Sequence, residues 1–170
     1  MLISEEYRKL NSDLHKADPS WGDGKAWVHT MAGKIADHIK AETILDYGAG
    51  KEALKAALGS KVISYDPAIE AISQAPEPAD LLVSCAVLEH VEPDCLGAVL
   101  LDMQRCTLKN ALIVVTTIPS SKILGDGRNA HLIIETPRWW LNILMAYWDI
   151  NAMQLSKIGF WFIGTRKKLH

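Results

Sequence analysis

The fold is decided by the stretch Thr43-Ile-Leu-Asp-Tyr-Gly-Ala-Gly-Lys-Glu-Ala-Leu54. It opens with an apolar run, passes through Asp46 to the glycine pair Gly48 and Gly50, and then takes on a helical pattern. Glycine is needed where the backbone adopts positive φ or approaches a ligand closely, and a helix N-terminus offers unpaired N–H groups. The stretch therefore predicts a strand, a glycine turn and a helix over 51–58, with a site for a nucleotide-like or carboxylate-bearing ligand at the turn.

Composition bounds the class of protein. The 170 residues are enough for one domain with a proper core, and we expect a single domain over 1–170. The net charge of −2 makes no electrostatic case for nucleic acid as a partner, and no apolar run is long enough to span a bilayer. The acidic start lacks the apolar core of a signal peptide, and the three separated cysteines read as free thiols. We therefore expect a cytoplasmic protein without a membrane partner or a bound metal, and the sequence does not specify its oligomeric state.

Two helices precede the first strand. They are predicted over 4–17 and 25–40, and the glycine-containing loop between them carries Trp21. We expect residues 1–41 to fold over a ligand at the glycine turn and residues 42–170 to form the core. Trp21 is a candidate for substrate binding, with ordinary packing as the alternative.

A second strand, over 61–66, ends in an acidic residue. Asp66 lies 18 positions after Gly48 (66 − 48) and is followed by Pro67. A carboxylate at the end of the second strand can accept hydrogen bonds from both hydroxyls of a ribose. The alternative is an aspartate that merely starts a turn, and the spacing favours the ribose role.

The next parallel strand, predicted over 80–87, follows closely. Only 14 positions (80 − 66) separate it from Asp66, and a crossover between parallel strands takes about a dozen residues or more. One short helix over 68–74 fits in this interval, but an extra strand with its own helix does not. We therefore expect the sheet to lack a third strand at this point.

The rest of the chain alternates helices and strands. The predicted elements are a helix over 93–105, a buried strand over 110–117, an irregular loop over 119–129, a helix starting at Thr136-Pro137, strands over 150–155 and 160–164, and a solvated tail over 166–170. This order predicts an α/β three-layer sandwich with a mostly parallel sheet and a C-terminal antiparallel hairpin. Ligands bind such sheets at the carboxyl ends of the strands, where Gly48, Asp66 and Ala86 fall.

Several motifs resemble those of the class I S-adenosylmethionine-dependent methyltransferases. They are Leu45-Asp-Tyr-Gly-Ala-Gly50, Tyr65-Asp66 and Asp80-Leu-Leu-Val-Ser-Cys-Ala-Val-Leu-Glu-His-Val91. The resemblance runs from about residue 25 to residue 167 and includes the terminal hairpin. Further stretches are similar to a group of small methyltransferase-like proteins of bacteria and their phages: Tyr7-Arg-Lys-Leu-Asn11 with His15, Tyr65-Asp-Pro-Ala-Ile69 and Asp126-Gly-Arg-Asn-Ala-His-Leu132.

The resemblance implies a Rossmann-like fold with S-adenosylmethionine as its cofactor. It implies that the glycine turn surrounds the methionine part, that Asp66 binds the ribose and that residues 85–87 lie beside the adenosine. The expected cofactor residues are Asp46, Tyr47, Gly48, Gly50, Asp66, Cys85, Ala86 and Val87.

The chain departs from the family's pattern at two points. Glu52 stands where the family usually has a third glycine, and its carboxylate either crowds the cofactor or points to solvent. The missing third strand often brings an acidic residue that contacts adenine, so adenine recognition is unassigned.

The candidate residues for the acceptor side of the pocket lie in or next to the loop that follows the predicted strand over 110–117. Methyl transfer from a sulfonium needs donor and acceptor held close and aligned, so it leaves no obligatory catalytic motif. His131 is the candidate base, and Arg128 and Asn129 are candidates for acceptor binding. We expect all three to border the acceptor side of the pocket, with ordering of the loop as the alternative for each. His90 is expected to be structural.

The sequence thus predicts a methyltransferase that acts on a small-molecule acceptor. One alternative is a protein that binds S-adenosylmethionine without transferring its methyl group, or breaks it down; Glu52 and the trimmed sheet motivate it. Another is a nicotinamide-dependent dehydrogenase, because Gly48, Gly50 and Ala53 match its glycine fingerprint. Asp46 and the terminal hairpin disfavour that reading.

Overall fold

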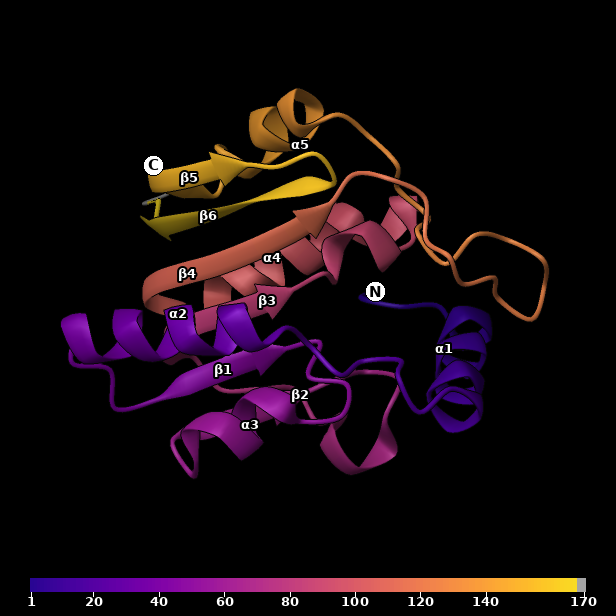
Figure 1. The fold of residues 1–170 in the computed structure, drawn as a ribbon, viewed down its shortest axis with the longest axis horizontal. Helices are drawn as coiled ribbons and strands as arrows, with labels where there is room; N and C mark the ends of the chain where they lie inside the picture. The colour runs from indigo at the N-terminus through magenta and orange to yellow at the C-terminus, as the bar shows by residue number, and fades with distance from the viewer. Residues whose placement is uncertain (168–170) are drawn as a thin grey trace.

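Six strands form a single sheet in the order β2-β1-β3-β4-β6-β5 in the computed structural model, which describes residues 1–167 (Figure 1). The strands are β1 (Ile44–Tyr47), β2 (Val62–Tyr65), β3 (Ala79–Cys85), β4 (Thr107–Thr116), β5 (Trp148–Leu155) and β6 (Gly159–Arg166). The first four run parallel, and β6 is antiparallel to both β4 and β5. The predicted terminal hairpin is therefore confirmed. The end of the predicted solvated tail, from residue 168 on, lies outside the described residues.

The predicted absence of a third strand is confirmed as well. β2 is an edge strand, and the chain passes from it to β3 through one short 3₁₀ turn, η1 (Glu70–Ile72), instead of the predicted helix over 68–74. The connection folds back on itself, since the Asp66 amide donates to the Ile72 carbonyl at 3.0 Å. This compact return leaves the carboxyl end of β2 open to the ligand side of the sheet.

Helices cover both faces of the sheet (Figure 1). One face carries α2 (Ala26–His38) and α3 (Ala53–Leu58), and the other carries α4 (Leu96–Cys106) and α5 (Pro137–Leu144). Successive side chains of a strand point to opposite faces, so Leu81 and Val83 of β3 join the core beneath α2 while Leu82 joins the core beneath α4. The three-layer sandwich is confirmed. Within residues 1–167, no helix combines the length and the apolarity that a membrane span requires.

The first helix, α1 (Glu5–Ala17), lies apart from these layers, beyond the carboxyl ends of the strands (Figure 1). Its N-cap is Ser4, whose hydroxyl accepts from the Tyr7 amide at 3.1 Å. The Ser4 amide and hydroxyl both donate to the carboxylate of Glu92 at 2.7 Å, and the Tyr7 hydroxyl donates to the His90 carbonyl at 2.5 Å. Glu92 and His90 belong to the two 3₁₀ turns after β3 or their margins, η2 (Leu88–His90) and η3 (Pro93–Cys95). These bonds fix α1 across the end of the sheet.

The helix after the glycine turn begins later than the sequence predicts. Glu52 has φ 58° and ψ 29°, a left-handed conformation, so α3 starts at Ala53 and not at Lys51. Glycine adopts this conformation without steric cost, whereas other residues are strained in it. Because α3 is short and starts late, contacts with neighbouring segments hold the glycine turn in place.

Candidate functional site

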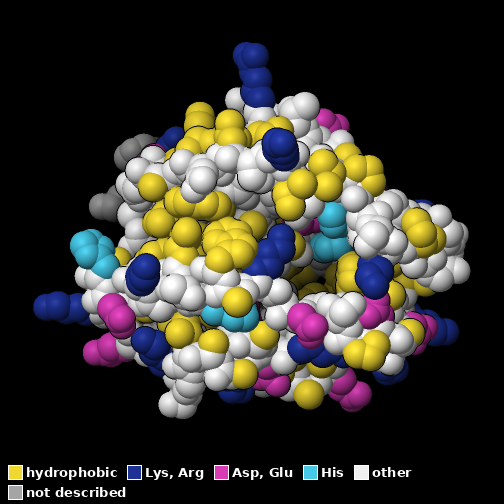
Figure 2. Space-filling view, viewed as in Figure 1, with side chains coloured by type: hydrophobic (Ala, Val, Ile, Leu, Met, Phe, Trp, Pro, Cys, Tyr) yellow, Lys and Arg dark blue, Asp and Glu magenta, His cyan; other side chains and the backbone are white. Residues whose placement is uncertain are grey.

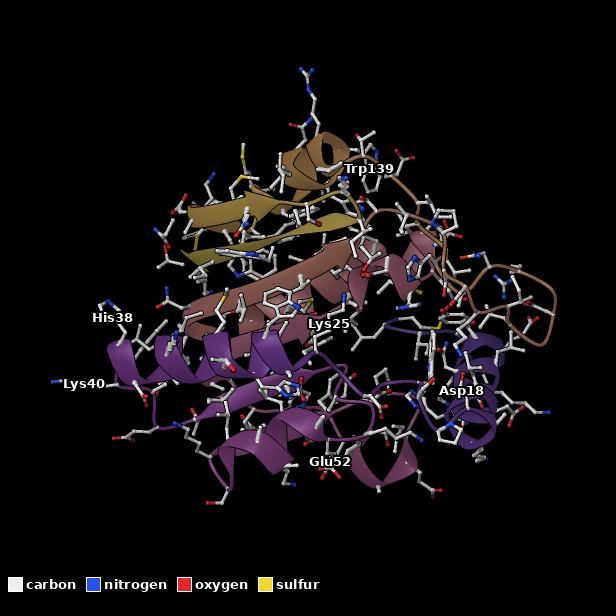
Figure 3. The ribbon with its side chains drawn as sticks, in the orientation of Figure 1. Asp18, Lys25, His38, Lys40, Glu52 and Trp139 are labelled. Carbon is white, nitrogen blue, oxygen red and sulfur yellow. The ribbon has the colours of Figure 1, made fainter. Side chains whose placement is uncertain are left out.

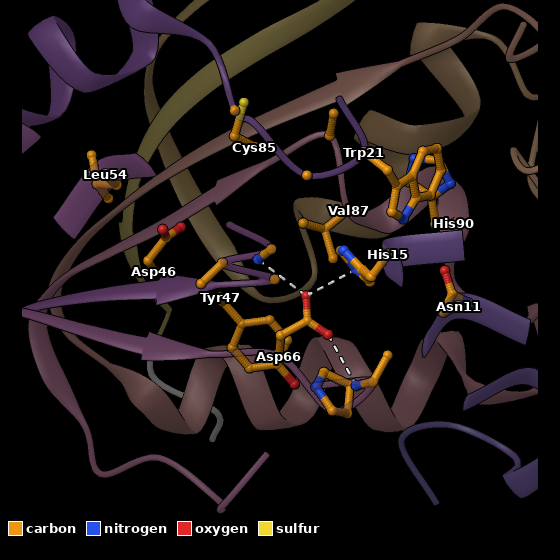
Figure 4. Close-up of a pocket in the computed structure, with 18 of the residues that line it drawn as sticks. Asn11, His15, Trp21, Asp46, Tyr47, Leu54, Asp66, Cys85, Val87 and His90 are labelled. Atoms are coloured by element: carbon orange, nitrogen blue, oxygen red, sulfur yellow. Dashed lines mark hydrogen bonds and ion pairs between the residues drawn. The ribbon is translucent and has the colours of Figure 1, made fainter. Parts of the chain in front are cut away.

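A cavity of about 310 Å³ opens at the carboxyl ends of β1, β2 and β3 (Figures 2 and 4). In the space-filling view it is the hollow right of centre, beside histidine side chains. The residues expected to bind the cofactor all line it: Asp46, Tyr47, Gly48, Gly50, Asp66, Cys85, Ala86 and Val87. Trp21, expected on the substrate side, lines it too. The structure thus brings together residues from three strand ends and from the loop between α1 and α2.

The glycine turn is packed too tightly for side chains. Gly48 has φ 83° and Gly50 has φ 52°. A Cβ at Gly48 would lie 2.4 Å from a methyl group of Val87, and one at Gly50 would lie 2.6 Å from the Gly22 carbonyl oxygen. The same carbonyl accepts from the Lys51 amide at 3.0 Å. The turn therefore presents bare backbone to the cavity and is clamped by the loop that follows α1.

Asp66 lies buried at the end of β2, in the wall of the cavity (Figure 4). One carboxylate oxygen accepts from the Gly50 amide at 3.2 Å, and the other accepts from the Ala68 amide at 3.0 Å. The His15 Nε2 lies 3.8 Å from the first oxygen. A carboxylate oxygen can accept more than one hydrogen bond, so both oxygens keep capacity for a pair of vicinal hydroxyls.

Asp46, at the end of β1, is a buried carboxyl close to other acids. Burial raises its pKa to about 7, and the negative charges of Asp66 and Glu52 add to the effect. Both causes disfavour the ionised form. A ligand with a positive charge would relieve this cost, whereas an anion placed here would increase it.

The inner face of α1 supplies side chains to the cavity lining to which the sequence assigned no role. Tyr7, Asn11 and His15 all line the cavity. Burial lowers the pKa of His15, and its Nδ1 is buried without a hydrogen-bond partner. The signal was the spacing of four residues, which places three polar or amphipathic side chains on one helix face.

Trp21 and His90 both line the cavity, and in Figure 4 they lie across it from Asp46, on the same side as Asn11. Their rings meet edge to face with centroids 4.9 Å apart. His90 Nδ1 lies 2.7 Å from the Ala130 carbonyl oxygen, and burial lowers the pKa of His90 to about 4. His90 is thus a neutral imidazole whose orientation is fixed by a hydrogen bond. The sequence predicted a structural role for it, and the structure adds that it lines the cavity.

The structure does not bring Arg128 and Asn129 to the cavity. Arg128 pairs with Asp126 at 2.6 Å on the surface, and Asn129 exchanges two hydrogen bonds with the Ser120 backbone. These short-range bonds use the polar atoms that were expected to bind an acceptor, and they match the loop-ordering alternative. His131 does not line the cavity either, but its ring packs against that of His90 at 4.7 Å between centroids.

Glu52 lies outside the cavity lining (Figure 3). Its carboxylate is 3.1 Å from the ammonium of Lys55 on α3, and the side chains of Lys55 and Glu52 are 47% and 41% exposed. Of the two possibilities that the sequence left open, crowding of a ligand or orientation toward solvent, the structure shows the second.

Comparison with known proteins gives a likeness in fold. No protein-family model and no curated protein matches the chain. The 1,6-didemethyltoxoflavin N1-methyltransferase of Burkholderia thailandensis, solved with 1,6-didemethyltoxoflavin and S-adenosylhomocysteine, has a TM-score of 0.69 at 15% identity over 99% of this chain and 92% of its own.

Two other solved structures agree. DhpI in complex with S-adenosylhomocysteine has a TM-score of 0.60 at 13% identity, over 96% of this chain and 98% of its own. An rRNA methylase of Escherichia coli has a TM-score of 0.59 at 15% identity, over 97% of this chain and 78% of its own. The match extends over both the parallel strands and the terminal hairpin. The chain therefore has the fold of the class I S-adenosylmethionine-dependent methyltransferases.

Proposed function

We propose that this chain is an S-adenosylmethionine-dependent methyltransferase that acts on a small-molecule acceptor. The observation that carries the proposal is the single cavity lined by the glycine turn, by Asp66 and by residues 85–87. The solved structures of similar fold support it, because their bound molecules include S-adenosylhomocysteine and, in one, the small molecule 1,6-didemethyltoxoflavin.

The residues of the cavity fit such a cofactor. The turn at Gly48 and Gly50 has no room for a Cβ and offers backbone to the methionine part. Asp66 has the free acceptor capacity that two ribose hydroxyls require. Asp46 is the buried acid that would face a cationic amino or sulfonium group. When bound, the cofactor supplies an electrophilic methyl group.

The chain's own contribution to transfer is positioning and exclusion of water. Methyl transfer is an in-line displacement, so its rate depends on holding the acceptor close to and aligned with the donor. We place the acceptor against Trp21 and His90, because these two rings line the cavity on the side across from Asp46 in Figure 4. α1 and the loop after it close the cavity over both ligands. His131, the candidate base predicted from the sequence, does not line the cavity and would influence an acceptor only through its contact with His90.

Titration calorimetry with S-adenosylmethionine and S-adenosylhomocysteine tests the proposal. Asp66→Asn keeps an oxygen for the Ala68 amide but removes the charge, and we expect a loss of about 1.5–3 kcal/mol, roughly tenfold or more in affinity. The matched control is Asp149→Ala, an exposed carboxylate on β5, which should bind as the unaltered chain does. Absence of both heat and thermal shift with either ligand at millimolar concentration would contradict the proposal.

The same samples separate the alternatives. A nicotinamide dehydrogenase would bind NAD and not S-adenosylhomocysteine. A protein that binds the cofactor without transferring its methyl group would show affinity but form no S-adenosylhomocysteine with any acceptor. Glu52 and the trimmed sheet motivated the alternative in which the cofactor binds without methyl transfer. Glu52 lies outside the cavity lining, so only the trimmed sheet still supports that alternative. Mass spectrometry of any co-purified ligand would identify the acceptor class directly.

A further inference from the structure

Three side chains beside the cavity converge on one point. One donor atom each from Glu89, His90 and His131 lies within 4.8 Å of the other two. Glu89 and His90 lie in η2, directly after β3, and His131 lies in the loop after β4. Backbone bonds join the two segments, since the amides of Leu132 and Ile133 donate to the Glu89 carbonyl at 2.8 and 3.0 Å. The cluster is therefore built by the fold and is not a chance meeting of surface side chains.

Glu89 is the most buried member of the cluster. Its side chain is fully buried, and one carboxylate oxygen accepts from the Thr116 amide at 2.8 Å. The other oxygen is buried without a hydrogen-bond partner. No salt bridge joins Glu89 to a basic side chain within residues 1–167. An unpaired buried carboxylate oxygen is costly, so this atom calls for a cation or a donor.

Both histidines are oriented by backbone carbonyls. His90 Nδ1 lies 2.7 Å from the Ala130 oxygen, and His131 Nδ1 is hydrogen-bonded to the Ile118 oxygen. A carbonyl only accepts, so each Nδ1 carries the hydrogen and each Nε2 keeps its lone pair. Histidines that bind metals are held in this way, with the outer ring nitrogen donating to a carbonyl or a carboxylate.

We propose that Glu89, His90 and His131 bind one divalent first-row transition-metal ion. Two imidazole nitrogens and one carboxylate suit Zn²⁺, Fe²⁺ or Mn²⁺ better than Mg²⁺, which prefers oxygen ligands. A bound zinc ion would draw the donors from within 4.8 Å to about 3.4 Å from one another. The separated cysteines predict no zinc site, and the proposed site uses none of them; its ligands come from two segments of the chain.

The position of the cluster suggests a use. His90 belongs both to the cluster and to the cavity lining, on the side across from Asp46 in Figure 4. If the proposed function holds, an ion here would lie on the acceptor side, where it would bind an acceptor oxygen and not the cofactor. The acceptor class favoured by this arrangement is a hydroxylated or carboxylated small molecule. Binding of the ion itself does not depend on methyl transfer.

The test is metal titration of chelator-treated full-length protein. We expect Zn²⁺ to bind with a stoichiometry of one, Co²⁺ to give the visible absorption of a protein-bound ion, and Mg²⁺ to give no heat. Glu89→Gln keeps an oxygen for the Thr116 amide, and His131→Ala removes a ring. Each should weaken Zn²⁺ binding by about 100-fold, since loss of a mere outer partner already costs about 10–100-fold. His38→Ala, an exposed histidine on α2, should leave it unchanged.

The outcomes decide the proposal. Failure of the unaltered chain to bind Zn²⁺, or equal binding by His131→Ala and His38→Ala, overturns it. Circular dichroism shows whether a variant has folded, and Glu89→Gln gives a second answer if His131→Ala has not. S-adenosylhomocysteine is titrated into the same samples. Binding of this ligand without binding of Zn²⁺ would reject the metal site and leave the proposed function standing, and the reverse result would reject the proposed function alone.

Discussion

At the scale of single residues, Asp46 predicts a pH dependence of cofactor binding. Its pKa is raised to about 7, first by burial and then by Asp66 and Glu52. A cationic ligand would lower that pKa, so binding would release a proton. The affinity for S-adenosylmethionine should rise from pH 6 to pH 8, by at most about tenfold per pH unit below the pKa.

Calorimetry in two buffers of different ionisation enthalpy measures the proton release. Asp46→Asn should flatten the profile, which assigns the effect to this carboxyl and not to Glu89, whose pKa burial also raises to about 7. The contribution of Asp46 to folding stability changes with pH in the opposite direction to its effect on ligand affinity. Because the pKa of Asp46 is higher in the folded chain than the ordinary 3.8, its stabilising contribution is complete below that value and is lost as the pH rises through about 7. An affinity independent of pH would contradict this account.

The left-handed backbone at Glu52 predicts that a glycine at this position would make the folded chain more stable. The left-handed φ of 58° strains any residue with a Cβ, and the ion pair of Glu52 with Lys55 is a partly exposed pair at the surface. Glu52→Gly should raise the free energy of unfolding by about 0.5–1 kcal/mol, because relief of the strain exceeds the loss of a surface pair. Lys40→Gly is the matched control, since Lys40 has φ 50° and lies away from the cavity (Figure 3).

Chemical denaturation measures both variants. We expect similar gains from the two, and unchanged affinity for S-adenosylhomocysteine in each. A clear loss of affinity in Glu52→Gly alone would mean that Glu52 takes part in the site despite lying outside the cavity lining.

At the scale of elements, α1 contributes to the cavity but is not part of the layers that cover the sheet. It carries Asn11 and His15 into the cavity, and its start is tied down through Ser4. Ser4→Ala removes the cap and one bond to Glu92, which should cost about 1 kcal/mol and loosen the helix. Faster amide exchange over 5–17 and weaker ligand binding should follow.

The matched control is another helix cap. Thr136 caps α5 by accepting from the Trp139 amide, and it does not line the cavity. Thr136→Ala should lower stability by a similar amount and leave the ligand affinity unchanged. Equal effects of the two substitutions on affinity would show that α1 acts only through general stability.

The elements also show how much of the site could be predicted. Gly48, Asp66 and residues 85–87 end neighbouring strands, and the parallel register, with Tyr47 beside Tyr65, places such ends together. Local pattern and the family resemblance together therefore predicted which strand ends line the cavity, and their role in binding a cofactor stays a prediction. The start of α3 was wrong because a helical pattern does not reveal a left-handed residue at Glu52.

The other side of the cavity depends on contacts that no local pattern encodes. The position of α1 rests on bonds from Ser4 to Glu92 and from Tyr7 to His90, which join residues 88 and 83 positions apart. In the loop over 119–129, polar side chains form hydrogen bonds within the loop itself, as Asn129 does with Ser120, and they do not line the cavity. Three side chains on the inner face of α1 line it instead, and the role of both groups in binding stays a prediction.

At the scale of the whole molecule, the cavity is lined by three segments that lie apart in the sequence. Its lining comes from residues 2–29, 46–68 and 83–99, which include α1, the glycine turn and the end of β3. A ligand that contacts all three adds free energy to the folded state only. S-adenosylhomocysteine at 100 times its Kd should stabilise the chain by about 2.7 kcal/mol and raise Tm by roughly 5–10 °C.

Thermal shift and hydrogen exchange together test this last prediction. We expect exchange to slow in all three segments at once, and the shift in Tm to shrink in Asp66→Asn at the same ligand concentration, because that variant binds less tightly. Protection limited to the glycine turn and β3, with residues 5–17 unchanged, would show that α1 does not close over the cofactor. The cavity would then be formed by the sheet alone, and the acceptor side proposed for Trp21 and His90 would lose its cover.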